Sequence, residues 1–379
     1  MAENVIQSPL EIKGLSKYLS FAFHRSVERA LWTFCELGVA DLMVHHQHPV
    51  TALQISQSNG NNWNTEFLYR FLRVIADAGI VTAVETNDDN CNKINRPEET
   101  IGFQLTEDGL LLTNDHFSKA RDMIRIELNP NMEKSCAYLP SVIKDGYKNG
   151  NSFEQAFGCS IFDYMQKDEN KEYTNLFNNS MLTYSVHLIE SMVSVVDFGR
   201  FSKLLDIAGG LGTLLSSVLE KNPYLHGILF DLDHVIASAK SLSPNEFERR
   251  KIEASRYEFI AGDMFNSETI PEADAYTLKF IIHDWNDEKA IEILRAIRAA
   301  NKMSTKKMIS IFLVEAVILS NGKDSCEAHA MDLEMLSSLS AKERTLAEYI
   351  FLLEKSGYEF KQIYKTKGAM SIIEATTII

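Results

Sequence analysis

The sequence predicts an α/β protein: a doubly wound, mostly parallel sheet preceded by a mainly helical N-terminal domain of winged-helix-like outline. Three observations lead to this fold class. From residue 203 onward, short apolar runs alternate with helical runs, as in parallel sheets covered by helices on both faces. The first third of the chain carries apolar residues at helical spacing. A strand-turn-strand pattern follows it and indicates a hairpin.

Length and composition are those of a globular protein with a sizeable core. The chain has 379 residues, 45% hydrophobic and 24% charged, which fits two domains of ordinary size. Its net charge of −14 repels phosphate backbones and anionic membrane surfaces. Nucleic acid and membranes are therefore not expected as partners.

The cysteines and the N-terminus point to the cytoplasm. The five cysteines are scattered and odd in number, and no C-x-x-C occurs, which favours free thiols in a reducing compartment. The first residues lack a basic start followed by an apolar run, so no signal peptide is predicted. No apolar stretch reaches 18 residues. We therefore expect a soluble cytoplasmic protein.

The first third predicts helices and then a hairpin. Apolar residues between 21 and 39 recur at helical spacing up to a stop at Gly38, and a second helical run covers 67–76. Strands are expected at 80–84 and 102–106, joined by a polar turn over 86–96. Modules of this outline often bind DNA, but the acidic charge favours a dimerisation or packing domain.

The middle of the chain predicts helices, and the last part predicts strands. Residues 153–196 are expected to be helical, with one apolar core face formed by Leu176, Phe177, Met181, Tyr184, Leu188, Met192 and Val195. Strands are expected at 204–208, 227–231, 257–260, 275–278 and 308–314. A last strand at 371–375 is expected to be an antiparallel edge strand.

A glycine-rich turn follows the first of these strands and opens a helix. Gly209, Gly210 and Gly212 let the backbone approach a ligand, and the helix start offers unpaired N–H groups. Leu215 replaces the third glycine of the dinucleotide fingerprint, and no P-loop lysine follows. Asp231 ends the next strand and can bond both hydroxyls of a ribose. The pattern favours a nucleoside-bearing ligand, although an ordinary tight turn would look similar.

A histidine follows a later strand, where open parallel sheets place their active sites. His283 can act as a base near neutral pH. Glu315 is expected at the end of the next apolar strand, and a carboxylate there can orient the imidazole and stabilise its charged form. A lone histidine is more often structural, and this neighbour strengthens the catalytic interpretation.

Five segments in order resemble one family. They are DIAGGLG (206–212), FDLDHV (230–235), GDMF (262–265), HDWNDE (283–288) and KERT (342–345). Together they are similar to the S-adenosylmethionine-dependent O-methyltransferases of the caffeate and hydroxyindole type. The stretches 153–158 and 177–181 resemble the helical connector of that family, and 294–300 resembles its bacterial members.

The resemblance implies a homodimer, a domain plan and a reaction. It places a winged-helix-like dimerisation domain at 1–115, a helical connector lining the acceptor pocket at 116–200, and a Rossmann-like class I methyltransferase domain at 201–379. The implied reaction is methyl transfer from S-adenosylmethionine to a hydroxyl of a small aromatic molecule by in-line displacement, leaving S-adenosylhomocysteine. No metal is expected.

The resemblance also implies roles for individual residues. His283 is the expected general base, flanked by Glu315 and Glu343. The expected acceptor-binding residues are Phe177, Met181 and Met335. The expected cofactor-binding residues are Asp206, Gly209, Gly210 and Gly212 at the methionine moiety, Asp231 at the ribose, Asp263, Met264 and Trp285 at the adenine, Ser185 at the cofactor carboxylate, and Lys279 at a further cofactor-contacting position.

The sequence departs from the family pattern at two places. Ala208 stands where the family usually starts its glycine run, and a methyl group fits if this residue has negative φ. Residues 339–341 replace paired glycines of plant members, which changes the local acceptor pocket.

Three other functions stay open on the sequence. The acceptor atom could be an amine nitrogen, which needs less help from a base. A protein that binds the cofactor without methyl transfer is a second alternative, disfavoured by the complete set of His283, Glu315 and Glu343. A DNA-binding regulator is a third, opposed by the net charge.

Overall fold

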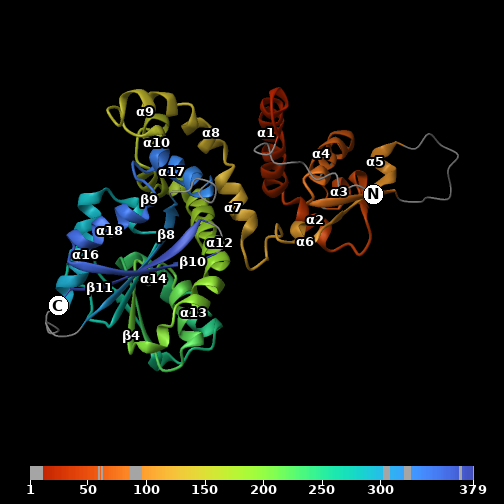
Figure 1. The fold of residues 1–379 in the computed structure, drawn as a ribbon. Helices are drawn as coiled ribbons and strands as arrows, with labels where there is room; N and C mark the ends of the chain where they lie inside the picture. Colours follow the sequence, from red (N-terminus) through yellow and green to blue (C-terminus); the bar gives the residue numbers. More distant parts are fainter. Residues whose placement is uncertain are drawn as a thin grey trace. The chain divides into compact units, whose positions relative to one another are not determined.

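The computed structural model describes residues 12–58, 60, 63–85, 96–301, 308–319, 326–366 and 369–378. The chain divides into two compact units (Figure 1). The first unit holds Met1–Lys134 and Met165–Thr183, and the second holds Ser135–Tyr164 and Tyr184–Ile379. The domain limits expected at residues 115 and 200 stay a prediction. Among the described residues, no helix is both long and apolar enough to cross a membrane.

The first unit consists of helices and a small sheet, as the sequence predicts. Its strands pair in the order β1-β3-β2, and β2 and β3 form the expected antiparallel hairpin. Residues 86–95 of the polar turn, and Cys91 with them, lie outside the described residues. The elements are α1 (Leu15–Glu36), α2 (Val39–Val44), β1 (Val50–Thr51), α3 (Ala52–Gln57), α4 (Thr65–Asp77), β2 (Val81–Glu85), α5 (Pro97–Thr100), β3 (Ile101–Leu105), α6 (Glu107–Leu110) and α7 (Ala120–Glu127).

Local sequence signals set these boundaries. α1 ends before Gly38, which adopts φ 63°, so the predicted stop is confirmed. Asn64 caps α4 by accepting a hydrogen bond from the backbone N–H of Phe67. The core of this unit gathers Phe34, Leu72 and other apolar residues of the helices around the buried face of the hairpin.

A series of helices continues the chain, as expected for residues 153–196. Helix α12 begins in the first unit and ends in the second. Of its predicted core face, Leu176, Leu188 and Met192 are buried, whereas Val195 is exposed. The helices are α8 (Pro130–Cys136), α9 (Leu139–Asp145), α10 (Ser152–Phe157), α11 (Ile161–Met165), η1 (Asp168–Asn170), α12 (Lys171–Val195) and η2 (Phe198–Arg200).

The second unit contains the predicted doubly wound sheet. Its strand order is β10-β11-β8-β7-β4-β5-β6, and β4 to β8 are mutually parallel. The order reverses at β4 and β7, so ligands are expected beyond the carboxyl ends of these two strands. The strands are β4 (Lys203–Ile207), β5 (His226–Asp231), β6 (Tyr257–Ala261), β7 (Ala275–Lys279), β8 (Ser310–Ile318), β9 (Arg344–Thr345), β10 (Tyr358–Lys365) and β11 (Met370–Thr377).

Helices cover both faces of this sheet (Figure 1). Alternate residues of each strand enter two cores, because strand side chains point to opposite faces. Leu205 and Leu278 pack with α16 and α18, whereas Leu204 and Phe312 pack with α12, α13 and α14. The remaining helices are α13 (Thr213–Lys221), α14 (Asp233–Ser241), α15 (Glu246–Arg249), η3 (Ala254–Arg256), η4 (Ile282–Asp284), α16 (Asp287–Ala300), α17 (Cys326–Ser338) and α18 (Leu346–Lys355).

Two strand predictions were wrong in detail. β11 is antiparallel as expected, but it pairs with both β8 and β10, so the edge strand is β10. β10 was not predicted, because its sequence YEFKQIYK is half polar, as is usual for a strand with one solvated face. β8 extends to Ile318, and Glu315 therefore lies inside this strand rather than at its end.

Candidate active site

The glycine-rich turn after β4 is held by left-handed backbone. Ala208, Gly210 and Gly212 have φ values of 51°, 59° and 87°. The condition of negative φ at Ala208 is therefore not met. The left-handed conformation costs an L-residue roughly 1–2 kcal/mol, which explains why glycine suits this position.

The glycines of this turn meet different surroundings. A Cβ on Gly209 would lie 2.6 Å from both Asp206 Oδ2 and Leu229 Cδ1, and one on Gly212 would lie 2.8 Å from the ring of Phe247. A Cβ on Gly210 would meet nothing within 4 Å. Close packing thus fixes the two outer glycines, while the middle one borders open space that a ligand could approach.

Asp231 closes the turn from the end of β5. Its Oδ2 accepts a hydrogen bond of 2.9 Å from Gly210 N, and its Oδ1 accepts one of 2.7 Å from Leu232 N. Burial raises the pKa of Asp231, although these two bonds oppose the shift. Each oxygen keeps a further lone pair, so the carboxylate can still accept from two ribose hydroxyls.

Asp206 lies buried beneath the turn. Its Oδ1 accepts a 2.6 Å hydrogen bond from Thr277 Oγ1, and its Oδ2 has no hydrogen-bond partner among the described residues. Burial raises the pKa of Asp206 to about 6. This unpaired oxygen and the open side of Gly210 fit a polar ligand with a cationic group, such as the methionine moiety of S-adenosylmethionine.

Lys279 ends β7 beside Asp206. Its Nζ donates a 2.9 Å hydrogen bond to Ser185 Oγ of α12. Burial lowers the pKa of Lys279 to about 8, against the attraction of Asp206 and Glu315. Lys279 and Ser185, both expected from the resemblance to contact the cofactor, are thus brought together.

The residues expected at the adenine form a neighbouring group. Asp263 is exposed and accepts a hydrogen bond from Phe265 N, while Met264 packs against the core. The ring of Trp285 meets that of Phe265 edge-on, with centroids 4.9 Å apart. Gly262 N donates to Asp231 O, which links this group to the end of β5.

The histidine lies on a short 3-10 turn after β7. Phe280 has φ 56°, so it lies in the left-handed region as Ala208 does, and its ring stacks on that of His283 with centroids 5.5 Å apart. The turn η4 then carries His283, which is buried. Backbone strain of this kind clusters at functional sites.

Three carboxylates surround the imidazole. Nδ1 lies 2.8 Å from Glu343 Oε1 and 3.9 Å from Glu315 Oε2, and Nε2 lies 3.4 Å from Asp284 Oδ1. Burial by itself lowers the pKa of His283, but the negative charges of Glu315, Glu343 and Asp284 outweigh it and raise the pKa to about 10. The carboxylates therefore make this histidine a stronger base than a free one.

The carboxylate of Glu315 binds mainly the backbone of the turn that carries His283. Its Oε1 accepts hydrogen bonds of 3.1 Å from Ile281 N and 2.8 Å from Ile282 N. Burial raises the pKa of Glu315 to about 7, against the attraction of His283. Ligand atoms of His283, Glu315 and Glu343 lie within 4.8 Å of one another, a spacing that could also hold a cation.

The residues expected at the acceptor divide between the units. Phe177 and Met181 lie half-buried on the part of α12 that belongs to the first unit. Met335 lies half-buried on α17 in the second unit. Their joint role in one acceptor pocket stays a prediction.

Sequence reasoning missed several residues of the site. Thr277 and Asp284 received no role, although Thr277 lies two residues before Lys279 on β7 and Asp284 follows His283 directly. Arg344 follows Glu343 and was quoted only as part of a motif. Its burial between several carbonyls has no local sequence signal, because the partners lie about 60 residues away.

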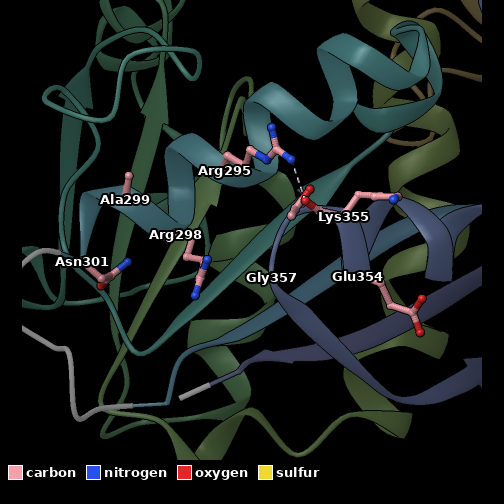
Figure 2. A pocket seen from close by; sticks show the side chains of 8 residues that line it. Arg295, Arg298, Ala299, Asn301, Glu354, Lys355 and Gly357 are labelled. Carbon is pink, nitrogen blue, oxygen red and sulfur yellow. Dashed lines mark hydrogen bonds between the residues drawn. The ribbon is translucent and has the colours of Figure 1, made fainter.

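A separate hollow of about 550 Å³ opens where α16 and α18 end (Figure 2). None of its lining residues belongs to the expected site. Cations near helix C-termini are favoured by the helix dipole, which accounts for the basic side chains without a ligand. The lining residues are Arg295, Arg298, Ala299, Asn301, Glu354, Lys355, Ser356 and Gly357.

Comparisons with known proteins agree with this geometry. A family model described as the O-methyltransferase domain matches residues 137–359, and one described as the O-methyltransferase dimerisation domain matches residues 19–98. The phenazine O-methyltransferase PhzM of Lysobacter antibioticus is 30% identical, with 93% of each chain covered. The (R,S)-reticuline 7-O-methyltransferase of Papaver somniferum is 30% identical, with 96% of this chain and 97% of its own covered.

Solved structures give the same result. The structure of LaPhzM matches with a TM-score of 0.79 and 27% identity, covering 97% of this chain and all of its own. The methyltransferase CalO1 of calicheamicin biosynthesis, in its S-adenosylhomocysteine-bound form, matches with a TM-score of 0.74 and 25% identity over 97% of this chain and all of its own.

Proposed function

This chain belongs to the O-methyltransferase family, and we propose that His283 is the general base of its methyl transfer to an aromatic hydroxyl. The chain is an enzyme that uses S-adenosylmethionine as methyl donor. The observation that carries the assignment of the base is the 2.8 Å contact between His283 Nδ1 and Glu343 Oε1 at the carboxyl end of the sheet.

The turn after β4 is proposed to hold the donor. Asp231 binds the ribose hydroxyls, and Asp206, Lys279 and Ser185 hold the charged ends of the methionine moiety. Asp263, Met264 and Trp285 flank the adenine, and Gly209, Gly210 and Gly212 shape the turn. The unpaired Oδ2 of Asp206 and the open space at Gly210 support this fit.

When bound, the donor supplies a methyl group already made electrophilic by its sulfonium, so no metal is needed. With Nδ1–H donated to Glu343, the lone pair of His283 lies on Nε2. Nε2 would take the proton of the acceptor hydroxyl. The donor would supply its methyl group to that oxygen in line, as the S–C bond breaks and S-adenosylhomocysteine leaves. Glu343 and Glu315 then stabilise the imidazolium, as a triad carboxylate does.

The raised pKa of His283 matches the pKa of a phenolic acceptor. A free phenol has a pKa of about 10, so a histidine with a pKa of ordinary size would accept its proton uphill. The carboxylates raise the pKa of His283 to about 10, which makes the transfer nearly balanced. The same shift leaves the base mostly protonated at neutral pH, so turnover should rise as pH increases.

The acceptor is proposed to be a small aromatic molecule with a hydroxyl. The relatives named above act on a phenazine and on reticuline. Phe177, Met181 and Met335 are the proposed lining, because methionines adapt to flat rings.

A homodimer and a cytoplasmic location complete the proposal. Leu15, Tyr18 and Phe23 on α1 expose 69–76% of their surface. Exposed apolar patches mark interaction sites. The match to a dimerisation domain over residues 19–98 supports a second copy as the cover. Among the described residues, Cys35 and Cys326 form no disulfide, which suits a reducing compartment.

Two measurements test the proposal in sequence. Calorimetry of S-adenosylhomocysteine binding should give micromolar affinity that Asp231→Ala loses, whether or not the acceptor is known. A panel of phenols with radiolabelled methyl donor should then yield an alkali-stable labelled ether. Binding without transfer to any phenol, together with transfer to amines, would overturn the hydroxyl assignment.

A further inference from the structure

Arg344 is the largest fully buried side chain of the described residues. Its Nη1 donates to Ile282 O at 2.8 Å and its Nη2 donates to Trp285 O at 2.7 Å. Nε and Nη2 also donate to Asp287 Oδ1 at 3.1 and 2.8 Å. A guanidinium without exposure is rare unless it is paired, because desolvation of its charge is costly.

The two carbonyls that Arg344 binds stand on either side of His283. Ile282 precedes the histidine, and Trp285 follows it by two residues. The main chain is held on its amide side too, because Glu315 Oε1 accepts from Ile281 N and Ile282 N. The guanidinium of Arg344 thus binds the carbonyls of this turn, and the carboxylate of Glu315 binds its amides.

The segment that contains Arg344 is itself fixed. Arg344 pairs with Val317 of β8, and Thr345 caps α18 with a capping box formed with Glu348. Lys342 N donates to His283 O at 3.3 Å, and Glu343 bonds the imidazole. Three successive residues, 342 to 344, therefore each hold a different part of the histidine turn.

We propose that Arg344 is a positioning residue, which clamps the carbonyls of Ile282 and Trp285 and so keeps His283 Nδ1 on Glu343. This inference rests on the proposed role of His283 as base. The planar fork of arginine spans two carbonyls and a carboxylate together, whereas the ammonium of a lysine binds as a point charge. The charge of Arg344 alone is thus insufficient, and its shape is what the turn requires.

The pKa of His283 distinguishes a positioning role of Arg344 from a direct effect of its charge. The titratable groups that act on the imidazole are Glu315 of β8, Glu343, and Asp284 of the turn itself. Tyr349 of α18 acts on the two glutamates, which together with burial raise its pKa. Removing the positive charge of Arg344 with the geometry intact would raise the pKa of His283. Release of His283 from Glu343 would instead lower it.

The test compares Arg344→Lys and Arg344→Met with Arg256→Met. Arg256 is a matched control, since its Nη2 donates to three backbone carbonyls of the same unit, those of Leu219, Asn222 and Leu225. For each variant, one would measure thermal stability, S-adenosylhomocysteine affinity, kcat and KM with the best phenol, and the titration of His283 by NMR of labelled histidine.

The proposal expects both Arg344 variants to lower kcat at least tenfold, to change KM less than threefold, and to lower the pKa of His283 toward its ordinary value. Arg256→Met should lose stability with kcat and the histidine titration unchanged. A raised or unchanged pKa of His283 in folded Arg344 variants, or full kcat, would overturn the proposal.

Two further measurements keep the test decisive. If the Arg344 variants do not fold, Asp287→Asn can be used instead, because it removes the half-exposed carboxylate partner of Arg344. This variant should lower kcat and the pKa of His283, both to a smaller extent. No change in either would then contradict the proposal. The histidine titration needs no acceptor, so it tests the clamp even if the assignment of the reaction fails.

Discussion

The turns after β4 and after β7 lie side by side at the same edge of the sheet, yet they are held in different ways. The β4 turn is shaped by backbone: three residues have positive φ, and glycines pack against Asp206, Leu229 and Phe247. The β7 turn has one left-handed residue, Phe280, and is held by the buried charges of Glu315, Glu343 and Arg344.

The two turns should therefore respond differently to substitution. A turn held by sterics tolerates changes of charge and fails when atoms are added. A turn held by buried charges tolerates small changes of volume and fails when one partner is removed, because the other is left uncompensated.

The largest effect is expected at the β7 turn. His283→Ala should lower kcat by roughly 10²–10⁴-fold, because it removes the general base, while the affinity for S-adenosylhomocysteine stays within a few-fold. Steady-state kinetics and calorimetry would measure both. His226→Ala, which removes a half-exposed histidine paired with Glu258, is the control and should leave kcat unchanged. Equal kcat in His283→Ala and the unmodified enzyme would contradict base catalysis.

Asp206→Asn tests the buried carboxylate beneath the β4 turn. The folded pKa of about 6 lies above the unfolded value of about 4, so ionisation destabilises the fold. The penalty is absent below pH 4 and complete above pH 6. The variant should therefore gain up to roughly 3 kcal/mol of unfolding free energy at pH 8, with no gain near pH 4, and should bind the donor more weakly. Denaturant unfolding at both pH values measures this, and a gain that does not depend on pH would refute it.

Adding a methyl group should break the β4 turn where it is tightly packed. Gly209→Ala puts a Cβ 2.6 Å from Asp206 Oδ2 and Leu229 Cδ1, and overpacking of this kind costs roughly 1–3 kcal/mol. Gly210→Ala meets no atom within 4 Å and bears only the left-handed strain. Donor affinity should fall in both, because one variant displaces Asp206 and the other fills the open space. A greater loss of stability in Gly210→Ala would show that packing is not what shapes this turn.

The smallest effect is expected at Ala208. Ala208→Gly relieves left-handed strain of roughly 1–2 kcal/mol, but the greater freedom of glycine in the unfolded chain offsets part of it. A net gain of about 0.5–1 kcal/mol in unfolding free energy is expected, with unchanged or tighter donor binding. Loss of stability would mean that the methyl group of Ala208 contributes packing that outweighs the strain.

Most of the sheet could be predicted from the sequence, and so could the meeting of its motifs at one edge. The reason is physical. Buried parallel strands are short apolar runs, and the residues that follow them must meet at one edge, so Asp206, Asp231 and His283 could be placed together. The edge strand β10 was missed, since its solvated face interrupts the apolar pattern. The end of β8 was also misplaced, because the charged Glu315 stands within a strand that is otherwise apolar.

Other features could not be predicted because they depend on long-range packing. The sign of φ at Ala208 follows from the path of the turn between β4 and α13, and alanine gives no local hint of it. The hydrogen bonds from Arg344 to Ile282 O and Trp285 O join segments about 60 residues apart. The sequence also gave Glu315 and Glu343 equal roles, whereas only Glu343 hydrogen-bonds the imidazole and Glu315 binds the backbone of the turn.

The titration of His283 in the S-adenosylhomocysteine complex tests most directly whether the carboxylates make this histidine the base. NMR of histidine-labelled protein, with the signal assigned by its loss in His283→Ala, follows the imidazole from pH 5 to pH 11 without any acceptor. We expect His283 to titrate well above its ordinary pKa, and Glu343→Gln to move the midpoint to lower pH by removing a negative charge and the hydrogen-bonded carboxylate. A midpoint at or below 6.5 that Glu343→Gln leaves unchanged would contradict it.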